Sequence, residues 1–224
     1  MYTYFKRLFD ILFSLFLLVI LSPLFCIICM ILRFSSEGEI FYFQERIGYK
    51  NTKFKIIKFA TMLKDSMNMG SGSITLRNDF RVTGPGKFLR KTKINELPQL
   101  FNILTGDISF VGPRPLVEET FNAYSNKLKS QIYDVKPGLT GIGSIIFRDE
   151  ESIITKAKFS NPKIYYKNEI APYKGALELW YQKKRSFLLD IQLILLTAWV
   201  VFYPNSKIIY DLFNDLPIKG KVID

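Results

Sequence analysis

Apolar residues recur at steps of three and four in a short stretch near the middle of the chain. This spacing predicts a helix over residues 96–104 with one buried face. The apolar positions are Leu97, Leu100, Phe101 and Leu104. Gly106 is placed to end the helix. Because Asn95 is a favoured N-cap and Pro98 is tolerated only in a first turn, we expect the helix to begin at Asn95.

A longer apolar run occupies residues 11–32, which contain no charged side chain. At about 1.5 Å per residue, a helix of this length just crosses a bilayer core of roughly 30 Å. Ser22 and Pro23 lie at its centre, where a proline kinks a helix. Lys6 precedes the run and Arg33 follows it, so the basic residues give no reason to place the two ends on opposite sides of the membrane. We expect a re-entrant helix hinged at these two central residues, with both ends on the cytoplasmic face; a kinked membrane span is the alternative.

Shorter periodic segments follow. Residues 40–43 and 54–59 are predicted as strands around a turn, residues 107–111 as a third strand, and residues 118–132 as helical. Residues 65–73 are rich in methionine, glycine and serine and are predicted as a loop.

The last apolar run, residues 187–203, is interrupted by Asp190 and Gln192 and is too short to span a membrane. An aromatic and basic group precedes it, as in helices that lie in a membrane interface, and a buried core helix is equally compatible. That group is Trp180, Tyr181, Lys183, Lys184 and Arg185.

The order of these elements predicts an α/β (α+β) fold. We expect a membrane anchor in residues 1–36 and one small cytoplasmic domain in residues 37–224 that carries interfacial helices. The 224 residues suffice for one domain of ordinary size plus an anchor. The low cysteine count, Cys26 and Cys29 alone, agrees with a reducing cytoplasmic setting.

The charged residues and the absence of histidine narrow the classes of function. The chain has 31 Lys and Arg against 20 Asp and Glu, a formal net charge of +11, and no histidine. The missing histidines exclude a Ser-His-Asp triad and histidine-ligated zinc. A basic surface suits nucleic acid, anionic lipid or phosphate-bearing substrates. Because the cations surround glycine-proline turns and an acid, without a recognised nucleic-acid motif, we expect no nucleic-acid partner.

The cations are densest in residues 78–115, around the predicted helix. Glu96 is an isolated acid among them, and such a carboxylate stays ionised and can hold a divalent metal that bridges a diphosphate. Arg114 stands between Pro113 and Pro115, whose fixed φ angles limit where its planar, phosphate-binding guanidinium can point. The cations just upstream of the acid are Lys87, Arg90, Lys91 and Lys93.

Three pieces of the sequence resemble the bacterial sugar transferase family, the monotopic phosphoglycosyl transferases. They are FQERIGYKNTKFKIIKFATM (residues 43–62), DFRVTGPGKFLRKTKINELPQLFNILTGDISFVGPRP (residues 79–115) and KPGLTG (residues 136–141). The resemblance implies transfer of a sugar 1-phosphate from a UDP-sugar to a polyprenyl (undecaprenyl) phosphate, with Mg²⁺ as cofactor and UMP as product. It also implies a re-entrant membrane helix, contact with membrane lipids, and a place on the cytoplasmic face of the inner membrane, at the first membrane step of polysaccharide or glycoconjugate assembly.

The candidate site residues follow from these motifs. The catalytic candidates are Glu96, Asn95 and Arg90; the substrate-binding candidates are Lys58, Arg81, Pro113, Arg114 and Pro115; and the metal candidates are Glu96 and Asp107. Lys58, near the active site by resemblance, is also compatible with a solvated strand lysine. Arg81 is equally compatible with a structural pair with Asp79. The Asp107 side chain either caps backbone amides or binds the metal.

One position departs from the family, which typically carries an adjacent Asp-Glu pair before LPQL, with the Asp as nucleophile. This chain has Asn95 and Glu96 there, and an amide is not a competent phosphoryl acceptor. Three hypotheses remain: Glu96 accepts the phosphosugar, the polyprenyl phosphate attacks directly while Asn95 orients the diphosphate, or the protein is a catalytically silent membrane scaffold. The sequence leaves open the sugar, the polyprenol and whether a homo-oligomer forms.

Overall fold

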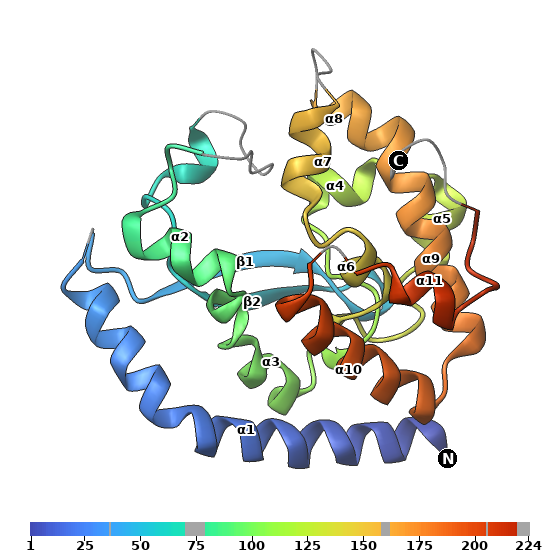
Figure 1. Cartoon of the computed structure of the whole chain (residues 1–224), viewed down its shortest axis with the longest axis horizontal. Helices are drawn as coiled ribbons and strands as arrows, with labels where there is room; N and C mark the ends of the chain where they lie inside the picture. Colours follow the sequence, from blue (N-terminus) through green and yellow to red (C-terminus); the bar gives the residue numbers. More distant parts are fainter. Residues whose placement is uncertain (36, 70–78, 158–161, 205, 219–224) are drawn as a thin grey trace.

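The structure is a computed structural model of the chain, and it describes residues 1–35, 37–69, 79–157, 162–204 and 206–218 (Figure 1). The α-helices are α1 (Tyr2–Arg33), α2 (Gly84–Lys91), α3 (Gln99–Thr105), α4 (Glu118–Asn122), α5 (Asn126–Gln131), α6 (Ile142–Ile146), α7 (Glu150–Lys156), α8 (Pro162–Tyr165), α9 (Ala171–Lys184), α10 (Phe187–Phe202) and α11 (Ile208–Leu212). The strands are β1 (Phe41–Ile47), β2 (Lys53–Phe59), β3 (Ser109–Val111) and β4 (Gly138–Thr140). Short 3₁₀ turns are η1 (Tyr49–Asn51), η2 (Ser66–Asn68) and η3 (Ile94–Glu96), and η4 (Tyr166–Ile170) is a π-helical turn.

The predicted strand pair is confirmed and crosses the middle of the molecule (Figure 1). β1 and β2 pair antiparallel, from Phe41 opposite Phe59 to Ile47 opposite Lys53. β1 runs further than predicted, through polar residues whose side chains alternate between exposed and half-buried positions. Since this period of two puts alternate side chains on one face, the hairpin can direct polar groups toward the interior.

The third strand and the loop after it bring two of the sequence motifs together. β3 pairs in parallel with β4, so the segment ending in Gly112 runs beside the KPGLTG segment. A Cβ on Gly138 would lie 2.1 Å from the backbone nitrogen of Gly112, and one on Gly141 would lie 2.3 Å from its carbonyl oxygen. These glycines are needed because the two backbones touch, leaving no room for a side chain between them.

Two helical predictions need correction. The helix predicted over residues 96–104 begins later, because Pro98 occupies the N-cap of α3 and Asn95 lies in the separate turn η3. Its predicted end is confirmed: Gly106 has a left-handed φ of 93°. The segment over residues 118–132 divides into α4 and α5, since the Ser125 side chain caps a new helix. The predicted loop over residues 65–73 starts with η2, and its part from residue 70 lies outside the described residues.

α1 is one continuous helix of 32 residues, bent into two arms, with Pro23 inside it (Figure 1). Proline has no backbone N–H, so the carbonyl of Val19, four residues earlier, loses its helical donor. The hydroxyl of Ser22 donates to this carbonyl at 2.8 Å. The Ser-Pro pair therefore allows a bend while the freed carbonyl keeps a partner.

The first arm of α1 is fastened to the domain by polar side chains. The guanidinium of Arg7 donates to the carbonyls of Ile103 and Leu104, at the last turn of α3. The buried carboxylate of Asp10 accepts hydrogen bonds from the hydroxyl of Ser109 and from the backbone of Phe110 in β3. These contacts align the first arm along α3 and β3.

A second group joins the start of α1 to α9 and α10. The ammonium of Lys6 pairs with the carboxylate of Asp190, which also accepts hydrogen bonds from the hydroxyls of Tyr2 and Tyr181. The second arm packs near its end, where Ile28 and Leu32 are buried with Phe59 and Leu89. α1 therefore contacts the domain near both of its ends.

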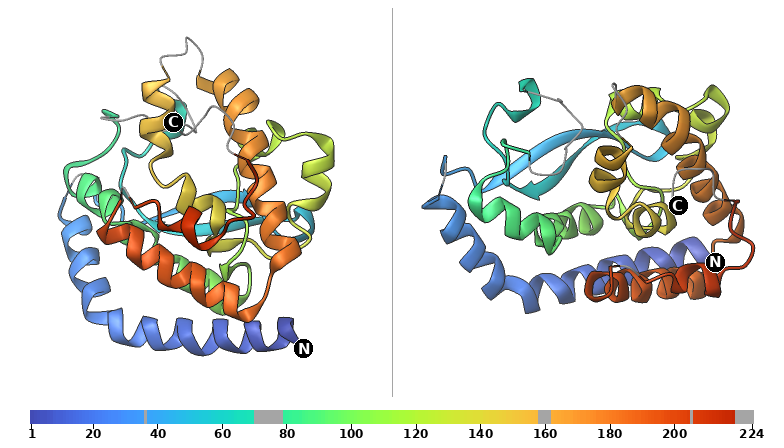
Figure 2. Two further views of the ribbon diagram at one scale, coloured as in Figure 1. Left: turned by 45° about the vertical axis from the view of Figure 1, so that its right-hand side comes forward. Right: turned by 45° about the horizontal axis from the view of Figure 1, so that its top comes forward.

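α10 has one buried face and one exposed apolar face. Leu189, Leu193, Leu196 and Val200 are buried, whereas Leu188, Leu195, Trp199 and Phe202 are exposed. α10 and α1 lie along the same side of the molecule (Figure 2). α1 is the one helix in the described residues long and apolar enough to cross a membrane, and only 11% of its apolar window is buried. The expectations of a core helix and of an interfacial helix thus each fit one face of α10.

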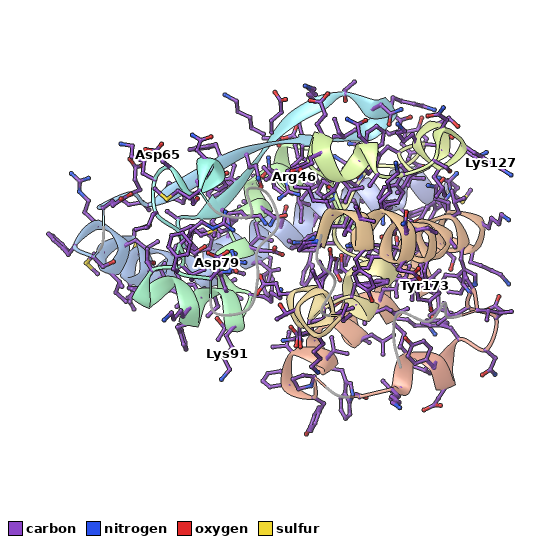
Figure 3. All side chains as sticks on the ribbon, turned by 90° about the horizontal axis from the view of Figure 1, so that it is seen from above. Arg46, Asp65, Asp79, Lys91, Lys127 and Tyr173 are labelled. Carbon is purple, nitrogen blue, oxygen red and sulfur yellow. The ribbon has the colours of Figure 1, made fainter. Side chains whose placement is uncertain are left out.

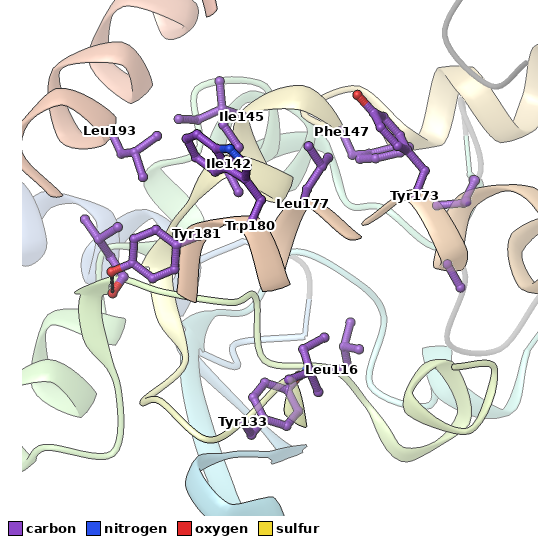
Figure 4. Packing of buried hydrophobic residues seen from close by; sticks show 14 of the residues in the cluster. Leu116, Tyr133, Ile142, Ile145, Phe147, Tyr173, Leu177, Trp180, Tyr181 and Leu193 are labelled. Atoms are coloured by element: carbon purple, nitrogen blue, oxygen red, sulfur yellow. Dashed lines mark hydrogen bonds between the residues drawn. The ribbon is translucent and has the colours of Figure 1, made fainter. Parts of the chain in front are cut away.

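The aromatic residues before α10 are not a surface belt. Trp180 and Tyr181 on α9 are 9% and 1% exposed and belong to the main hydrophobic core. Figure 4 shows Trp180 beside Leu177 of the same helix and Ile142 and Ile145 of α6. Of the two sequence interpretations, the aromatic belt is wrong for these rings, because α6 covers Trp180 and the Tyr181 hydroxyl bonds to Asp190 of α10.

Candidate active site

A cavity of about 1380 Å³ lies between the hairpin with α2 and η3 on one side and α6, α7 and α9 on the other. Figure 3 looks down on this region, with Arg46 labelled near the middle and Lys91 of α2 and Tyr173 of α9 on opposite sides. Its polar lining includes Lys58, Arg90, Lys93, Asn95, Glu96 and Arg114. Residues distant in the sequence thus share one cavity.

Glu96 is the centre of the polar cluster. Its Oε1 accepts hydrogen bonds from the ammonium of Lys58 at 3.1 Å and from the guanidinium of Arg114 at 2.7 Å. The Glu96 side chain is 13% exposed. Burial alone would raise its carboxyl pKa, but Arg114, Lys58 and Lys93 hold that pKa well below its usual value. The carboxylate is therefore charged, as the sequence analysis expected.

Burial has the opposite effect on the pKa of the neighbouring Lys58 ammonium. Burial lowers the pKa of the Lys58 ammonium to about 7; Glu96 favours the charged form, while Arg114 and Arg46 oppose it. Lys58 lines the cavity and only 14% of its side chain is exposed, so the interpretation as a solvated strand lysine does not hold.

Asn95 lies in a short turn on the cavity wall. Lys93 has a left-handed φ of 62°, and the turn η3, which contains Asn95, follows it before α3 begins. The side-chain Oδ1 of Asn95 is buried and makes no hydrogen bond within the described residues. Asn95 therefore offers an oxygen to a bound molecule, in place of the helix cap that the sequence predicted.

Arg114 is held through the backbone on either side of it. The carbonyl of Pro113 accepts from the backbone of Gly138, and the carbonyl of Pro115 accepts from the guanidinium of Arg46. The carbonyl of Arg114 accepts from the hydroxyl of Tyr133. The backbone of the segment is thus hydrogen-bonded at three consecutive carbonyls, and the two prolines take part through theirs.

Arg46 is a cavity residue that sequence reasoning missed. Burial lowers the pKa of its guanidinium to about 10, with Arg114 acting in the same direction and Glu96 against it. Its Nε is buried without a hydrogen bond within the described residues. Alternation along β1 puts Arg46 on the same face as Gln44, which also lines the cavity. Extending the predicted strand by four residues would have revealed this inward position.

Arg90 lies on the cavity but not against Glu96. Its guanidinium pairs with the carboxylate of Glu151 on α7, across the cavity from α2. Lys93 is the closer influence on Glu96, since its charge lowers the pKa of that carboxyl. The structure thus brings Lys58, Glu96 and Arg114 into direct contact and puts Arg90 at a second ion pair.

Two candidates have mainly structural contacts. The guanidinium of Arg81 is 1% exposed, pairs with Asp79 and donates to the carbonyls of Ser66 and Met69, which supports its interpretation as a structural pair. The carboxylate of Asp107 accepts from Asn102 and Thr105 at the end of α3 and is not among the residues that line the cavity. Both donors are side chains of α3, so within the described residues Asp107 does not make the predicted cap on backbone amides, and its contacts are those of a structural residue.

The other end of the same cavity is apolar. It reaches α1 and α10, the two helices that carry exposed apolar faces. Its apolar lining includes Phe13 and Leu17 of α1, Phe110, Leu139, and Ile194 and Val201 of α10. The ionic cluster and this apolar end belong to one continuous space.

Fold and site together define an α+β protein that has apolar surface helices and a cavity suited to a phosphate-bearing molecule. The chain belongs to the bacterial sugar transferase family, whose model it matches over residues 1–204. It is 37% identical to the exopolysaccharide production protein ExoY of Sinorhizobium fredii over 168 residues, which cover 69% of this chain and 74% of that protein.

Two further relatives extend the comparison. The uncharacterized sugar transferase EpsL of Bacillus subtilis is 34% identical over 193 residues, 86% of this chain and 85% of that protein. The UDP-glucose:undecaprenyl-phosphate glucose-1-phosphate transferase of Klebsiella pneumoniae is 34% identical over 205 residues, which cover 90% of this chain but 41% of that protein. The match with the Klebsiella enzyme thus concerns less than half of it.

Proposed function

We propose that this protein transfers a sugar 1-phosphate from a UDP-sugar to a polyprenyl phosphate, releasing UMP. The observation that carries the proposal is the single cavity that joins the Lys58–Glu96–Arg114 cluster to an apolar end at α1 and α10. One substrate is water-soluble and charged and the other is a lipid, so the reaction requires both environments in one space. The names of several relatives, such as the undecaprenyl-phosphate galactose phosphotransferase of Salmonella typhimurium, describe the same type of reaction.

We also propose that the protein is monotopic, on the cytoplasmic face of the inner membrane, with α1 as a re-entrant helix. Contacts of α1 with the domain near both of its ends support this placement. The exposed apolar faces of α1 and α10 would enter the lipid side by side.

In this function, Arg114 and Lys58 bind the diphosphate of the donor and stabilise the negative charge that develops during transfer. Phosphoryl transfer depends mainly on positioning and on such charge stabilisation. Arg46, behind Arg114, adds to the positive potential and holds the carbonyl of Pro115. Arg90 can exchange Glu151 for a phosphate oxygen, since both side chains are partly exposed in the cavity.

The residues present fit a magnesium ion. Mg²⁺ prefers oxygen ligands and binds through one or two protein groups together with substrate phosphates. Glu96 provides a charged carboxylate, and Asn95 provides a buried oxygen that has no partner within the described residues. When bound, the ion would neutralise charge on the diphosphate.

For the acceptor step we favour direct attack by the lipid phosphate. A phosphate oxygen of the polyprenyl phosphate attacks the phosphorus that carries the sugar, and the bond from that phosphorus to the bridging oxygen breaks. The electron pair leaves with UMP, and the lipid retains a diphosphate-linked sugar. Glu96 is poorly suited to be the acceptor, since the cations that depress its pKa also lower its nucleophilicity.

The test replaces Glu96 by Gln, which keeps the shape of the side chain but removes its charge. We expect UMP release from UDP-sugar and polyprenyl phosphate to fall at least about 100-fold, the usual effect of losing one electrostatic group. Glu119→Gln, in an exposed ion pair on α4, is the matched control and should retain full activity. Full activity of Glu96→Gln would remove Glu96 from the mechanism, and no release by the wild-type protein with any UDP-sugar would favour the scaffold alternative.

A further inference from the structure

A second polar cluster on the cavity wall is not used by the phosphate chemistry. The ammonium of Lys174 on α9 pairs with the carboxylate of Glu150 at the start of α7. It also lies over the rings of Phe147 and Tyr166, with its nitrogen 5.5 Å and 5.9 Å from their centroids. Glu150, Tyr166 and Lys174 belong to α7, η4 and α9, and Phe147 directly follows α6. All four residues line the cavity.

The two members of the ion pair differ in exposure. The Lys174 side chain is only 4% exposed, whereas that of Glu150 is 27% exposed and so remains open to the cavity. Burial opposes the charge on Lys174, but Glu150 and Tyr166 more than offset it and raise the pKa of the ammonium above its usual value. The pair is therefore an enclosed, charged donor next to a partly open acceptor.

The cluster also adjoins the phosphate site. The charge of Glu150 and the hydroxyl of Tyr166 both act on the guanidinium of Arg114, and Arg114 acts in turn on Lys174. In a UDP-sugar the sugar ring is bonded directly to the outer phosphate. A phosphate held at Arg114 therefore brings the ring toward either this cluster or the other walls of the cavity.

Stability does not explain the pair well. A buried ion pair is often no more stabilising than apolar side chains of similar volume, because both charges lose their hydration. A carboxylate beside an ammonium suits a sugar hydroxyl, which donates to the first group and accepts from the second at once. An aromatic ring such as Tyr166 adds an apolar surface for the sugar ring.

Resting on the function proposed above, we propose that Glu150 and Lys174 form the subsite that selects the donor sugar, by binding one hydroxyl of its ring. Glu150 accepts the hydrogen of that hydroxyl, and Lys174 donates to its oxygen. The substrate class is a UDP-hexose that carries this hydroxyl, and analogues lacking it are disfavoured because they form neither the hydrogen bond to Glu150 nor the one from Lys174.

The test compares the best UDP-hexose with its 2-, 3-, 4- and 6-deoxy analogues, using full-length protein in nanodiscs and UMP release to obtain kcat/KM. For wild type we expect one analogue to be slower by about 10-fold or more. Glu150→Gln should reduce that preference to within about 3-fold, mainly by slowing the parent sugar. Glu119→Gln should keep the wild-type ratios. Lys174→Met, which retains an apolar chain between the two rings, serves as the second variant should Glu150→Gln not fold.

The outcomes separate the two proposals. The subsite would be overturned, with the transferase function intact, by either of two results. One is that the ratio of kcat/KM between parent sugar and each analogue is the same in wild type and both variants; the other is that a variant loses kcat/KM equally for every donor. No UMP release by wild type with any donor would overturn the function and the subsite with it. If the preference for the parent sugar over one analogue disappears in the variants but not in the control, the hydroxyl missing from that analogue is the one recognised.

Discussion

Glu178 on α9 is a buried acid in contact with Gly143, where a Cβ would lie 2.3 Å from its carboxylate oxygen. Burial raises its pKa to about 8, although Lys174 and Arg114 act to lower it. The folded protein therefore keeps this proton up to about pH 8, whereas an unfolded glutamate loses it above roughly pH 4.5. Between these two values the folded state binds more protons, so stability falls as pH rises.

We accordingly predict that Glu178→Gln flattens the pH dependence of stability. The amide cannot titrate, so the free energy of unfolding of the variant should rise relative to that of wild type as the pH increases from about 5 to 8. The gain is on the order of a few kcal/mol, since each tenfold change in proton affinity between the folded and unfolded states corresponds to about 1.4 kcal/mol. Denaturant unfolding at several pH values measures it, and parallel curves for the two proteins would contradict a raised pKa at Glu178.

Asn95 decides whether the protein itself carries the phosphosugar. We predict that Asn95→Asp, incubated with donor and no acceptor, gains a covalent phosphosugar on the introduced carboxylate, because residue 95 lines the same cavity as Arg114. Wild-type protein should gain none. Intact-protein mass spectrometry detects the adduct, and an adduct on wild type would refute direct attack and make Glu96 the acceptor.

The parallel pair of β3 and β4 is the element on which the position of Arg114 depends. The two strands bring the segment around Arg114 against the KPGLTG loop, with backbone in contact with backbone. A methyl group at Gly138 would overlap the nitrogen of Gly112, and neither backbone can move without disturbing the pair. The element therefore tolerates no side chain at this place.

We predict that Gly138→Ala lowers stability by about 1–3 kcal/mol, as for other overpacked sites, or about 2–4 °C of Tm for each kcal/mol. Gly84→Ala is the control: nothing lies within 4 Å of a Cβ there, so its Tm should be unchanged or slightly raised. Thermal unfolding followed by circular dichroism measures both variants. An unchanged Tm for Gly138→Ala would show that the two strands can separate enough to admit a methyl group.

The whole molecule has one side formed by α1 and α10, whose outward residues are apolar. Lys6 and Arg7 lie near the start of the first arm of α1. Lys6 pairs with Asp190, and Arg7 donates to carbonyls at the end of α3. The first arm of α1 is thus fastened along the domain, and this supports the re-entrant arrangement proposed above.

We predict that both ends of α1 are accessible from the same side of the membrane. Single cysteines at Thr3 and Phe34, in protein with Cys26 and Cys29 replaced by Ala, should react with an impermeant thiol reagent only in vesicles where a cysteine at Lys127 also reacts. Lys127 is an exposed domain residue and so marks the domain side. Labelling of Thr3→Cys from the opposite side would establish a span.

The sequence by itself determined the elements whose signal is local. The hairpin, the helix end at Gly106, the proline inside α1 and the charged state of Glu96 follow from periodicity, glycine and proline chemistry, and charge. Each of these depends on neighbours within a few residues. Local pattern is enough to specify them because backbone geometry and side-chain period act over that range.

Only the tertiary structure decided which groups meet. It put Arg46 beside Arg114, paired Arg90 with Glu151, and buried Trp180 in the core. These outcomes depend on contacts between segments that are distant in the chain, where burial changes the cost of a charge and the choice of partner. The turn at Asn95 belongs with them, because Asn95 lies in η3 on the cavity wall and Pro98 takes the N-cap of α3, against the local preference of asparagine for a helix cap.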